Sequence, residues 1–495
     1  MMFNVLTHPW VPLDVGGTTK LAAYADILCG ESDSDDLRHP RDDLRFFARM
    51  LLSALTQALF PARDTTELQR RIDEPLPRQR VEKRIQEVSC DFELIGDNPF
   101  MQDAGTAGEK NCTGQLFFDI PVGTKHVLFR PVGVADGLCP SCALLAMYGL
   151  QAFATQGGRG YSPGVRGAPP VTTLVRVGSV RKSMWANTLS CAKMEALGYP
   201  ADEKQPWCSA RHEQSGDTVG LVQGLFWQPR SLVFHEVGEG HCASCGHVGS
   251  RLAAFSIAKK SKVTGGFFRH PFSPAFEATG ATAKQPWSPV HVPANRPIWT
   301  GLADMLAVVR ADAATTSSKS ISHAAPVVEQ WVSDLGYRRA SLAILEYHSK
   351  KTKICGRVSE EYELSIQLGR DFESEVRFLV DAAQDVLGCM LKALREAYSN
   401  RKRGNGGFFQ EDARAEFWRA TEPSFWAAFL RIGDGGEVDE YLRGLRLVAL
   451  ALFDLHTGTS SLDNSKQALV AQARRRLCRH LYKRFAPVAP CRGES

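Results

Sequence analysis

Residues 40–60 carry the clearest hydrophobic periodicity in the chain. Apolar side chains recur there at steps of three and four residues: Leu44, Phe47, Ala48, Leu51, Leu52, Leu55, Ala58 and Leu59. This spacing aligns them on one face and predicts a core helix with a single apolar stripe. Pro61 ends the pattern, and Asp64 with Glu67 has the form of a capping box for a second helix that extends through Arg71.

The pattern changes over residues 88–350. Short runs of β-forming residues, such as 172–177 and 220–227, are separated there by Gly and Pro. We therefore expect an irregular α+β body. Within it, residues 310–325 are rich in Ala, Ser and Thr and predict a loop or short linker.

Helical patterns return after about residue 365. They cover residues 372–398, 410–432, 438–456 and 466–485, and Gly-containing turns separate them. Four helices joined by short turns predict a bundle. The expected fold class is α+β, with a large irregular N-terminal α+β domain over residues 1–365 and a C-terminal four-helix bundle over residues 366–495.

The composition narrows the class of protein. Of 495 residues, 44% are hydrophobic and 23% are charged, as in soluble globular proteins. No apolar run reaches about 18 residues, and the N-terminus lacks the features of a signal peptide. We expect a cytoplasmic protein without a membrane partner. Thirteen cysteines, an odd number, fit reduced thiols and a metal site better than a disulfide framework.

Positive charge is modest overall but clustered. The formal net charge is +5, yet residues 466–495 contain eight Lys and Arg against one acidic residue, and further basic clusters lie at 259–262 and 401–403. Such clusters favour contact with a nucleic-acid backbone. The neighbouring positive charges of Arg474, Arg475 and Arg476 destabilise the protein unless negatively charged groups bind near them. We therefore expect these three residues to contact a phosphate backbone.

Two Cys-x-x-Cys pairs are the most informative motif. Cys139 and Cys142 form the first pair, Cys242 and Cys245 form the second, and 99 residues separate the pairs. Each pair has the spacing that zinc thiolates need, and together they can close one tetrahedral site. The sequence therefore predicts a zinc knuckle in the N-terminal domain, with structural Zn²⁺ on which folding depends.

Other readings of these cysteines remain open. Cys139 and Cys142 could be the redox pair of a thiol oxidoreductase, although this leaves the second pair unused. His241 and His247 flank the second pair and could replace one sulfur. A zinc deaminase needs a Pro before its Cys-x-x-Cys, where this chain has Leu138, and a His-x-Glu, which the sequence lacks. A zinc-containing nucleic-acid-modifying enzyme stays as an alternative, but a metal with four protein ligands favours a scaffold role.

Common catalytic signatures are missing from the sequence. There is no Walker-type phosphate loop and no His-Glu-x-x-His motif. Residues 160–164 match a nucleophile elbow, but Pro163 has no N–H to donate to an oxyanion. These residues belong to a glycine-rich loop, 156–164, which is either an ordinary connection or a place of close backbone approach to a ligand. Residues 337–341 predict a basic hairpin or turn. We expect the chain not to be an enzyme.

The chain resembles the CasA family, the large subunits of the type I-E CRISPR surveillance complex Cascade. The resemblance extends over nearly the whole length and includes both cysteine pairs. Its other markers, in chain order, are residues 3–12 (FNVLTHPWVP), 40–43 (PRDD), 98–102 (NPFMQ), 170–173 (PVTT), 224–229 (GLFWQP) and 270–274 (HPFSP). The resemblance implies a non-catalytic subunit that checks double-stranded DNA for the protospacer-adjacent motif and helps to open the duplex. It also implies partners: guide RNA, other Cascade subunits and a helicase-nuclease.

The resemblance also implies positions for the site residues. A glycine loop at Gly157, Gly158, Arg159 and Gly160 would enter the minor groove. Lys260, or else Lys259, would contact the motif. Phe129 and Arg130, in a loop ahead of the first cysteine pair, would contact the 5′ handle of the guide and neighbouring subunits. A hairpin wedge would fall at Ala340 and Ser341, where short side chains replace the Asn and Gln of the family. Alternatively, the alignment shifts by a residue or two and Arg338, Arg339 or Leu342 takes part, or the protein reads a different motif or opens DNA differently.

Overall fold

The structure is a computed structural model. It describes residues 3–96, 98–117, 137–156, 161–202, 205–208, 211–278, 287–308, 320–337, 339–350, 353–365, 370–398, 406–432, 438–458 and 464–484. The chain divides into two compact units. Unit 1 comprises Met1–His291 and Asp304–Ile366, and unit 2 comprises Val292–Ala303 and Gln367–Ser495. The short segment Val292–Ala303 thus belongs to the unit of the C-terminal helices. The boundary expected from the sequence, near residue 365, had included this segment in the N-terminal domain.

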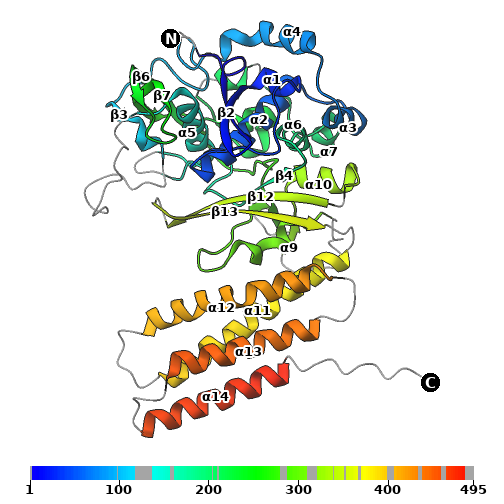
Figure 1. Ribbon diagram of the computed structural model, residues 1–495, viewed down its shortest axis with the longest axis vertical. Coiled ribbons are helices and arrows are strands. Elements are labelled where there is room, and N and C mark those ends of the chain that lie inside the picture. The colour runs from blue at the N-terminus through cyan, green and yellow to red at the C-terminus, as the bar shows by residue number, and fades with distance from the viewer. Residues whose placement is uncertain are drawn as a thin grey trace, which may run out of the picture. The chain divides into compact units, whose positions relative to one another are not determined.

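Unit 1 contains the described strands, which form several small sheets (Figure 1). These sheets are a β1–β2 hairpin, a short β5–β8 pair, and the sheets β3–β7–β6, β13–β12–β4 and β10–β9–β11. The strands are β1 Pro9–Val15, β2 Thr18–Ala23, β3 Asn111–Cys112, β4 Thr172–Arg176, β5 Glu213–Gln214, β6 Arg230–His241, β7 Val248–Lys259, β8 Lys262–Val263, β9 Ala275–Ala278, β10 Trp287–Pro289, β11 Ser320–His323, β12 Arg339–Lys350 and β13 Lys353–Ser365.

Helices surround these sheets in unit 1. They are α1 Tyr24–Leu28, α2 Asp42–Leu59, α3 Thr65–Asp73, α4 Arg78–Val88, α5 Pro140–Ala152, α6 Val180–Ala186, α7 Cys191–Ala196, α8 Leu221–Leu225 and α10 Pro326–Glu329; α9, Leu302–Met305, spans the division between the units. The small sheets and scattered helices confirm the expected irregular α+β body.

Helix α2 forms as predicted, but more than one face of it is buried. Besides the predicted stripe, the polar residues Arg49, Ser53, Thr56 and Gln57 are also buried. Ser53 and Thr56 donate to main-chain carbonyls one turn earlier, and Gln57 exchanges hydrogen bonds with the backbone of Leu189. Arg49 pairs with Asp36 and Glu361, so all four of these side chains have partners, which is the condition for burying polar groups on such a helix.

The predicted cap of helix α3 is half correct. Asp64 accepts the amide of Glu67 at 2.8 Å, as a capping box requires. The Glu67 carboxylate accepts the amide N–H of Arg63 at 2.9 Å, whereas in a capping box it would accept the amide of the N-cap residue, Asp64. The side chain of Glu67 also pairs with Arg71 at 2.5 Å. It therefore connects Arg63, which precedes α3, to the second turn of the helix.

One sequence-based expectation in unit 1 is wrong. The run at 220–227 contains helix α8, because Gln223 accepts the Gly220 amide at 3.3 Å and Asp202 accepts the Gln223 amide at 2.8 Å. Of residues 337–341, which were expected to form a basic hairpin or turn, Arg339, Ala340 and Ser341 begin the first strand of the β12–β13 hairpin, and Arg338 lies outside the described residues. Of the expected linker 310–325, residues 320–323 form β11 and 310–319 lie outside the described residues.

Unit 2 contains the predicted four helices, which run side by side in Figure 1. They are α11 Arg370–Ala397, α12 Gly406–Phe429, α13 Val438–Thr457 and α14 Asn464–Arg484. Trp299, fully buried, stacks on Phe425 at 4.2 Å between ring centroids and meets the edge of Trp418 at 5.4 Å. The inserted segment therefore supplies an aromatic side chain to the core of the bundle. Among the helices that the structure describes, none is both long and apolar enough to cross a membrane.

The contact between α5 and α2 gives a test of this core. Gly149 of α5 packs on the Phe47 ring, and a Cβ at Gly149 would overlap that ring. Phe47 cannot move aside easily, since Phe153 and Tyr347 lie 5.4 and 6.5 Å from it. We expect Gly149→Ala to lower the free energy of unfolding by roughly 1–3 kcal/mol, as measured by thermal unfolding.

Gly444 is the matched control, since it is also helical but a Cβ there would meet no described atom within 4 Å. Gly444→Ala should stabilise the protein slightly, by roughly 0.5–1 kcal/mol. Equal effects of the two substitutions would contradict the packing argument.

Candidate metal centre and nucleic-acid interface

The two cysteine pairs come together in unit 1. Cys139 is the N-cap of α5 and Cys142 lies in its first turn, while Cys242 and Cys245 lie in the turn between β6 and β7. The ligand atoms of the four residues lie within 4.8 Å of one another. This confirms that the four predicted cysteines form one cluster. His241 and His247 are not members of it.

Backbone hydrogen bonds join the two pairs. Leu138 and Leu252 exchange amide–carbonyl bonds of 3.0 and 2.8 Å, and the amide of Ala243 donates to the Gly137 carbonyl at 2.9 Å. Gly137 has a φ of +88°, and a Cβ there would lie 2.9 Å from the Leu252 carbonyl oxygen. Glycine at this position thus allows the first pair to approach strand β7 closely.

The sulfur atoms fit a tetrahedral metal ion. Three of the four cysteines are buried, and Cys139 Sγ lies 3.7 Å from Cys245 Sγ. A tetrahedron with zinc–sulfur bonds of about 2.3 Å has edges of roughly 3.8 Å. A hydrogen bond with Cys139 is the chief cause that lowers the pKa of Cys242, and a separate hydrogen bond with Cys139 is the chief cause that raises the pKa of Cys142. A divalent cation would allow all four groups to be thiolates at once.

Two buried arginines hold the base of the glycine-rich loop. Gly157, Gly158, Arg159 and Gly160 lie outside the described residues, but both flanks are described. The guanidinium of Arg230 donates to the Thr155 carbonyl at 2.8 Å on one flank and to the Ser162 carbonyl on the other. Burial lowers the pKa of Arg230 to about 10. At this pKa the side chain stays charged near neutral pH, so both bonds are charge-assisted.

Arg166 reinforces the same base. It donates to the Ala152 carbonyl at 3.1 Å and to the hydroxyls of Thr172 and Ser273 at 2.7 and 3.0 Å. Its guanidinium lies 4.4 Å from the centroid of the Phe153 ring. Burial lowers the pKa of Arg166 to about 9. The flanks of the loop are therefore anchored in the core.

The two candidate lysines occupy different environments. Lys260 is only 7% exposed, and its Nζ donates to Gln228 Oε1 at 2.7 Å. Lys259 is exposed at the end of β7, with its Nζ 5.9 Å from the Tyr161 ring. Tyr161 follows the glycine loop directly and also lies under the Arg230 guanidinium, at 4.8 Å. Lys259 is therefore the lysine that combines exposure with proximity to the glycine loop.

The β12–β13 hairpin is anchored at Asp43 of α2. The buried Asp43 carboxylate accepts the Tyr347 hydroxyl at 3.0 Å and the Arg357 guanidinium at 2.9 Å, and it also pairs with Arg41. A second carboxylate, Glu361 of β13, pairs with three arginines: Arg45, Arg49 and Arg176. Sequence reasoning missed this network, although the 40–43 marker contains three of its members: Arg41, Asp43 and also Asp42, which pairs with Arg357 at 2.6 Å.

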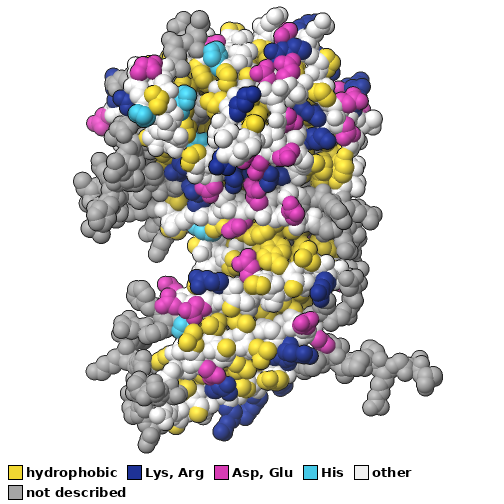
Figure 2. Space-filling view, viewed as in Figure 1, with side chains coloured by type: hydrophobic (Ala, Val, Ile, Leu, Met, Phe, Trp, Pro, Cys, Tyr) yellow, Lys and Arg dark blue, Asp and Glu magenta, His cyan; other side chains and the backbone are white. Residues whose placement is uncertain are grey.

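The remaining predicted contacts are only partly visible. Phe129, Arg130 and Arg338 lie outside the described residues. Arg474, Arg475 and Arg476 are exposed on α14, where Lys and Arg side chains gather in Figure 2. Arg474 pairs with Asp454 at 2.6 and 2.8 Å, and Arg476 pairs with Glu396 at 3.3 Å. Two of the three arginines thus have counter-charges within unit 2, which weakens the argument from charge repulsion.

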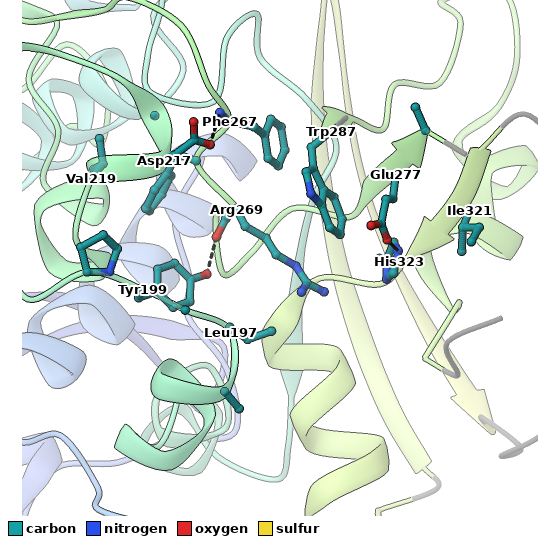
Figure 3. Close-up of a pocket in the computed structure, with 16 residues that line it drawn as sticks. Leu197, Tyr199, Asp217, Val219, Phe267, Arg269, Glu277, Trp287, Ile321 and His323 are labelled. Atoms are coloured by element: carbon teal, nitrogen blue, oxygen red, sulfur yellow. Dashed lines mark hydrogen bonds and ion pairs between the residues drawn. The ribbon is translucent and has the colours of Figure 1, made fainter. Parts of the chain in front are cut away.

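A cavity of about 670 Å³ lies elsewhere in unit 1 (Figure 3). The Phe267 and Trp287 rings lie nearly parallel there, and Arg269 approaches Trp287 while pairing with Glu329. Glu277 bonds to His323, whose pKa burial lowers. The described lining adds a further carboxylate, Asp217, so this cavity does not favour a phosphate group. Its residues come from separate segments of the chain, so no local sequence pattern marks it.

The cysteine cluster generates a test. Cys139→Ser should reduce bound zinc well below one ion per chain and lower the melting temperature by at least about 5 °C, because zinc binding is coupled to folding. Metal analysis and thermal unfolding check this. Cys191→Ser, at an exposed cysteine outside the cluster, is the control and should change neither quantity. Retained zinc and loss of a reductase turnover would instead support the thiol oxidoreductase alternative.

Comparison with known proteins places the chain in a family. The model of the family "CRISPR-associated protein Cse1 (CRISPR_cse1)" matches residues 4–452. CasA (Cse1) from Thermus thermophilus has a similar structure, with a TM-score of 0.72 and 16% identity over 97% of this chain and 99% of that one.

Two further structures are similar. Cse1 from Acidimicrobium ferrooxidans gives a TM-score of 0.70 at 14% identity, covering 98% of each chain. A chain of a CRISPR RNA-guided surveillance complex gives 0.73 at 14% identity, covering 96% of this chain and 99% of that one. At such identities the structures show a shared fold, whereas the family match extends over most of the sequence. The chain belongs to the CRISPR-associated Cse1 (CasA) family.

Proposed function

We propose that the chain is the non-catalytic large subunit of a type I-E Cascade surveillance complex. In this role it recognises a protospacer-adjacent motif in double-stranded DNA through the minor groove. It then promotes duplex opening and R-loop formation, and it provides a docking surface for a helicase-nuclease. Family membership supports the proposal, as does the likeness to a chain of an RNA-guided surveillance complex.

The observation that carries the DNA-binding proposal is the anchored base of the glycine loop. Arg230 and Arg166 fix its two flanks, and Lys259 stands exposed beside Tyr161 at the point where the chain leaves the loop. A loop without Cβ atoms can bring its main chain close to a groove, while a neighbouring lysine neutralises phosphate charge. The rigid base keeps the ends of such a loop in place during contact.

A small number of contacts is enough for this role. Guide pairing supplies sequence specificity, and the exchange of one duplex for another is nearly balanced in free energy. A subunit therefore needs only to bias where opening begins. Minor-groove contacts mainly distinguish A·T from G·C, and an arginine such as Arg159 responds to groove width and potential. We expect tolerant motif recognition.

The geometry of the hairpin favours a different position for the proposed wedge. Ser341 pairs with Glu363 on one side and with Arg176 on the other, so it lies inside a three-stranded sheet. Pairing on both sides holds the main chain of Ser341 in the sheet, which disfavours Ser341 as a wedge. The opposite end of the hairpin, where Lys350 pairs with Lys353, leads into residues 351 and 352. This end has the sequence Lys-Lys-Thr-Lys, and we propose it as the wedge in place of residues 338–341.

The proposed metal role is structural. Four cysteine ligands would complete the tetrahedral shell of Zn²⁺ and leave no position for substrate or water. The ion would therefore join α5 to the β6–β7 turn, and it would not activate a nucleophile. This arrangement supports the non-catalytic proposal over a zinc-containing nucleic-acid-modifying enzyme.

The contacts proposed for Phe129 and Arg130 rest on family resemblance, whereas those proposed for Arg474, Arg475 and Arg476 rest on the clustering of positive charge in the sequence. Phe129 and Arg130 are proposed to contact the 5′ handle of the guide and neighbouring subunits. Arg474, Arg475 and Arg476 are proposed to hold the displaced strand or face the small subunits. Of these three, Arg475 is the best candidate for backbone contact, because Arg474 and Arg476 already pair with carboxylates.

Charge reversal at Lys259 tests the DNA-binding proposal. In the assembled complex, Lys259→Glu should weaken binding to motif-bearing duplex DNA roughly tenfold and reduce the slope of log affinity against log salt by about 1. Binding to guide-complementary single-stranded DNA should stay nearly unchanged. Gly160→Asp should have the same selective effect, since it places a carboxylate in the glycine loop.

The control for Lys259 is Lys83→Glu, on the exposed surface of α4, which should leave both substrates unaffected. Equal losses on duplex and single-stranded DNA would count against motif reading.

The hairpin end generates a separate prediction. Reversing Lys350, Lys351 and Lys353 to Glu should slow duplex opening, measured by fluorescence of 2-aminopurine beside the motif, while initial binding to the motif persists. Ser341→Ala should change neither step, because Ser341 lies within the sheet. An opening defect in Ser341→Ala with normal opening in the triple variant would restore the original wedge assignment.

A further inference from the structure

His39 contacts the cysteine cluster from a third segment of the chain. Its Nε2 lies 3.3 Å from the Sγ of Cys142, although 103 residues separate the two in sequence. His39 immediately precedes Pro40 and the start of α2. It belongs to neither Cys-x-x-Cys pair, and the sequence pattern of the cysteines gives no reason to expect it.

The backbone fixes which nitrogen of His39 carries the proton. Nδ1 accepts the amide N–H of Arg41 at 3.0 Å, shorter than the 3.3 Å between this nitrogen and the Arg41 carbonyl oxygen. A nitrogen that accepts a hydrogen bond has no proton of its own, so the ring proton sits on Nε2. His39 therefore donates Nε2–H toward the sulfur of Cys142.

We propose that His39 is a positioning residue of the metal centre and that it couples the centre to the β12–β13 hairpin. This rests on the proposed structural metal but is independent of DNA binding. With a cation bound, Cys142 is a thiolate, and the N–H of His39 stabilises its negative charge and fixes the direction of the sulfur. Hydrogen bonds of this kind around a ligand set both its geometry and its affinity for the metal.

A continuous set of contacts leads from His39 to the hairpin. Arg41, whose amide fixes the His39 ring, donates Nε–H to Asp43 at 2.9 Å. Asp43 in turn holds Tyr347 of β12 and Arg357 of β13. The same Arg41 guanidinium lies 4.1 Å from the centroid of the Phe117 ring, the last described residue before segment 118–136. The segment that leads into α2 therefore contacts both the metal cluster and the part of the hairpin that lies near the Lys350–Lys353 end.

Metal affinity provides the first test, with Co²⁺ and Zn²⁺ as probes on the purified chain. His39→Phe removes the donor, and we expect its dissociation constant for either ion to rise roughly 10–100-fold. The absorption of bound Co²⁺ should keep the intensity of a tetrahedral four-thiolate site, with its sulfur-to-metal charge-transfer band shifted. His39→Gln, which can still offer an N–H, should recover part of the affinity.

His247→Ala is the matched control, because His247 is exposed beside the second pair and lies outside the cluster. Circular dichroism of the metal-loaded variants establishes that each one folds. If His39→Phe matches His247→Ala in both affinity and Co²⁺ spectrum, the positioning role is wrong. That outcome would leave the proposed DNA function untouched, since motif binding is measured separately.

Hydrogen exchange tests the coupling. In the metal-loaded His39→Phe protein, backbone amides around Tyr347 and Arg357 should exchange faster than in His247→Ala, while those of helices α11–α14 should be unchanged. Reduced metal affinity with unchanged exchange at these strands would overturn the coupling to the hairpin and retain the positioning role.

Discussion

Four sulfur atoms within 4.8 Å of one another are the constraint on which the rest of unit 1 depends. They join the N-terminus of α5 to the β6–β7 turn across 99 intervening residues. Closing so long a loop costs conformational entropy that a metal–thiolate site can offset. Because β7 ends at Lys259 and β6 begins at Arg230, this closure also positions the residues beside the glycine loop.

The structure separates anchoring groups from groups that are free to contact a partner. Arg166, Arg230 and Lys260 are buried and bonded to backbone or side-chain oxygens, so their charges serve the fold. Lys259, by contrast, is exposed at the end of β7. Basic residues that look alike in a sequence thus have different roles, which burial and hydrogen bonding distinguish.

The sequence predicted the features whose signals are local. The stripe of α2, the four C-terminal helices and the Cys-x-x-Cys spacing all depend on residues a few positions apart. Segment 220–227 was misassigned because a short apolar run does not distinguish strand from helix, and its cap comes from Asp202. The sequence left residues 339–341 open between a hairpin and a turn, because their pairing partners on β4 and β13 are distant in sequence. His39 and the cavity near Trp287 depend on tertiary contacts alone.

The insertion of Trp299 into unit 2 has a consequence for biosynthesis. Its partners Trp418 and Phe425 are translated roughly 120 residues later. At ~5–20 residues per second, Trp299 is therefore synthesised on the order of 6–24 s before the side chains that bury it. Unit 1 can be complete in sequence before α11 leaves the ribosome. During this interval, segment Val292–Ala303 lacks the aromatic partners that bury Trp299 in the folded protein.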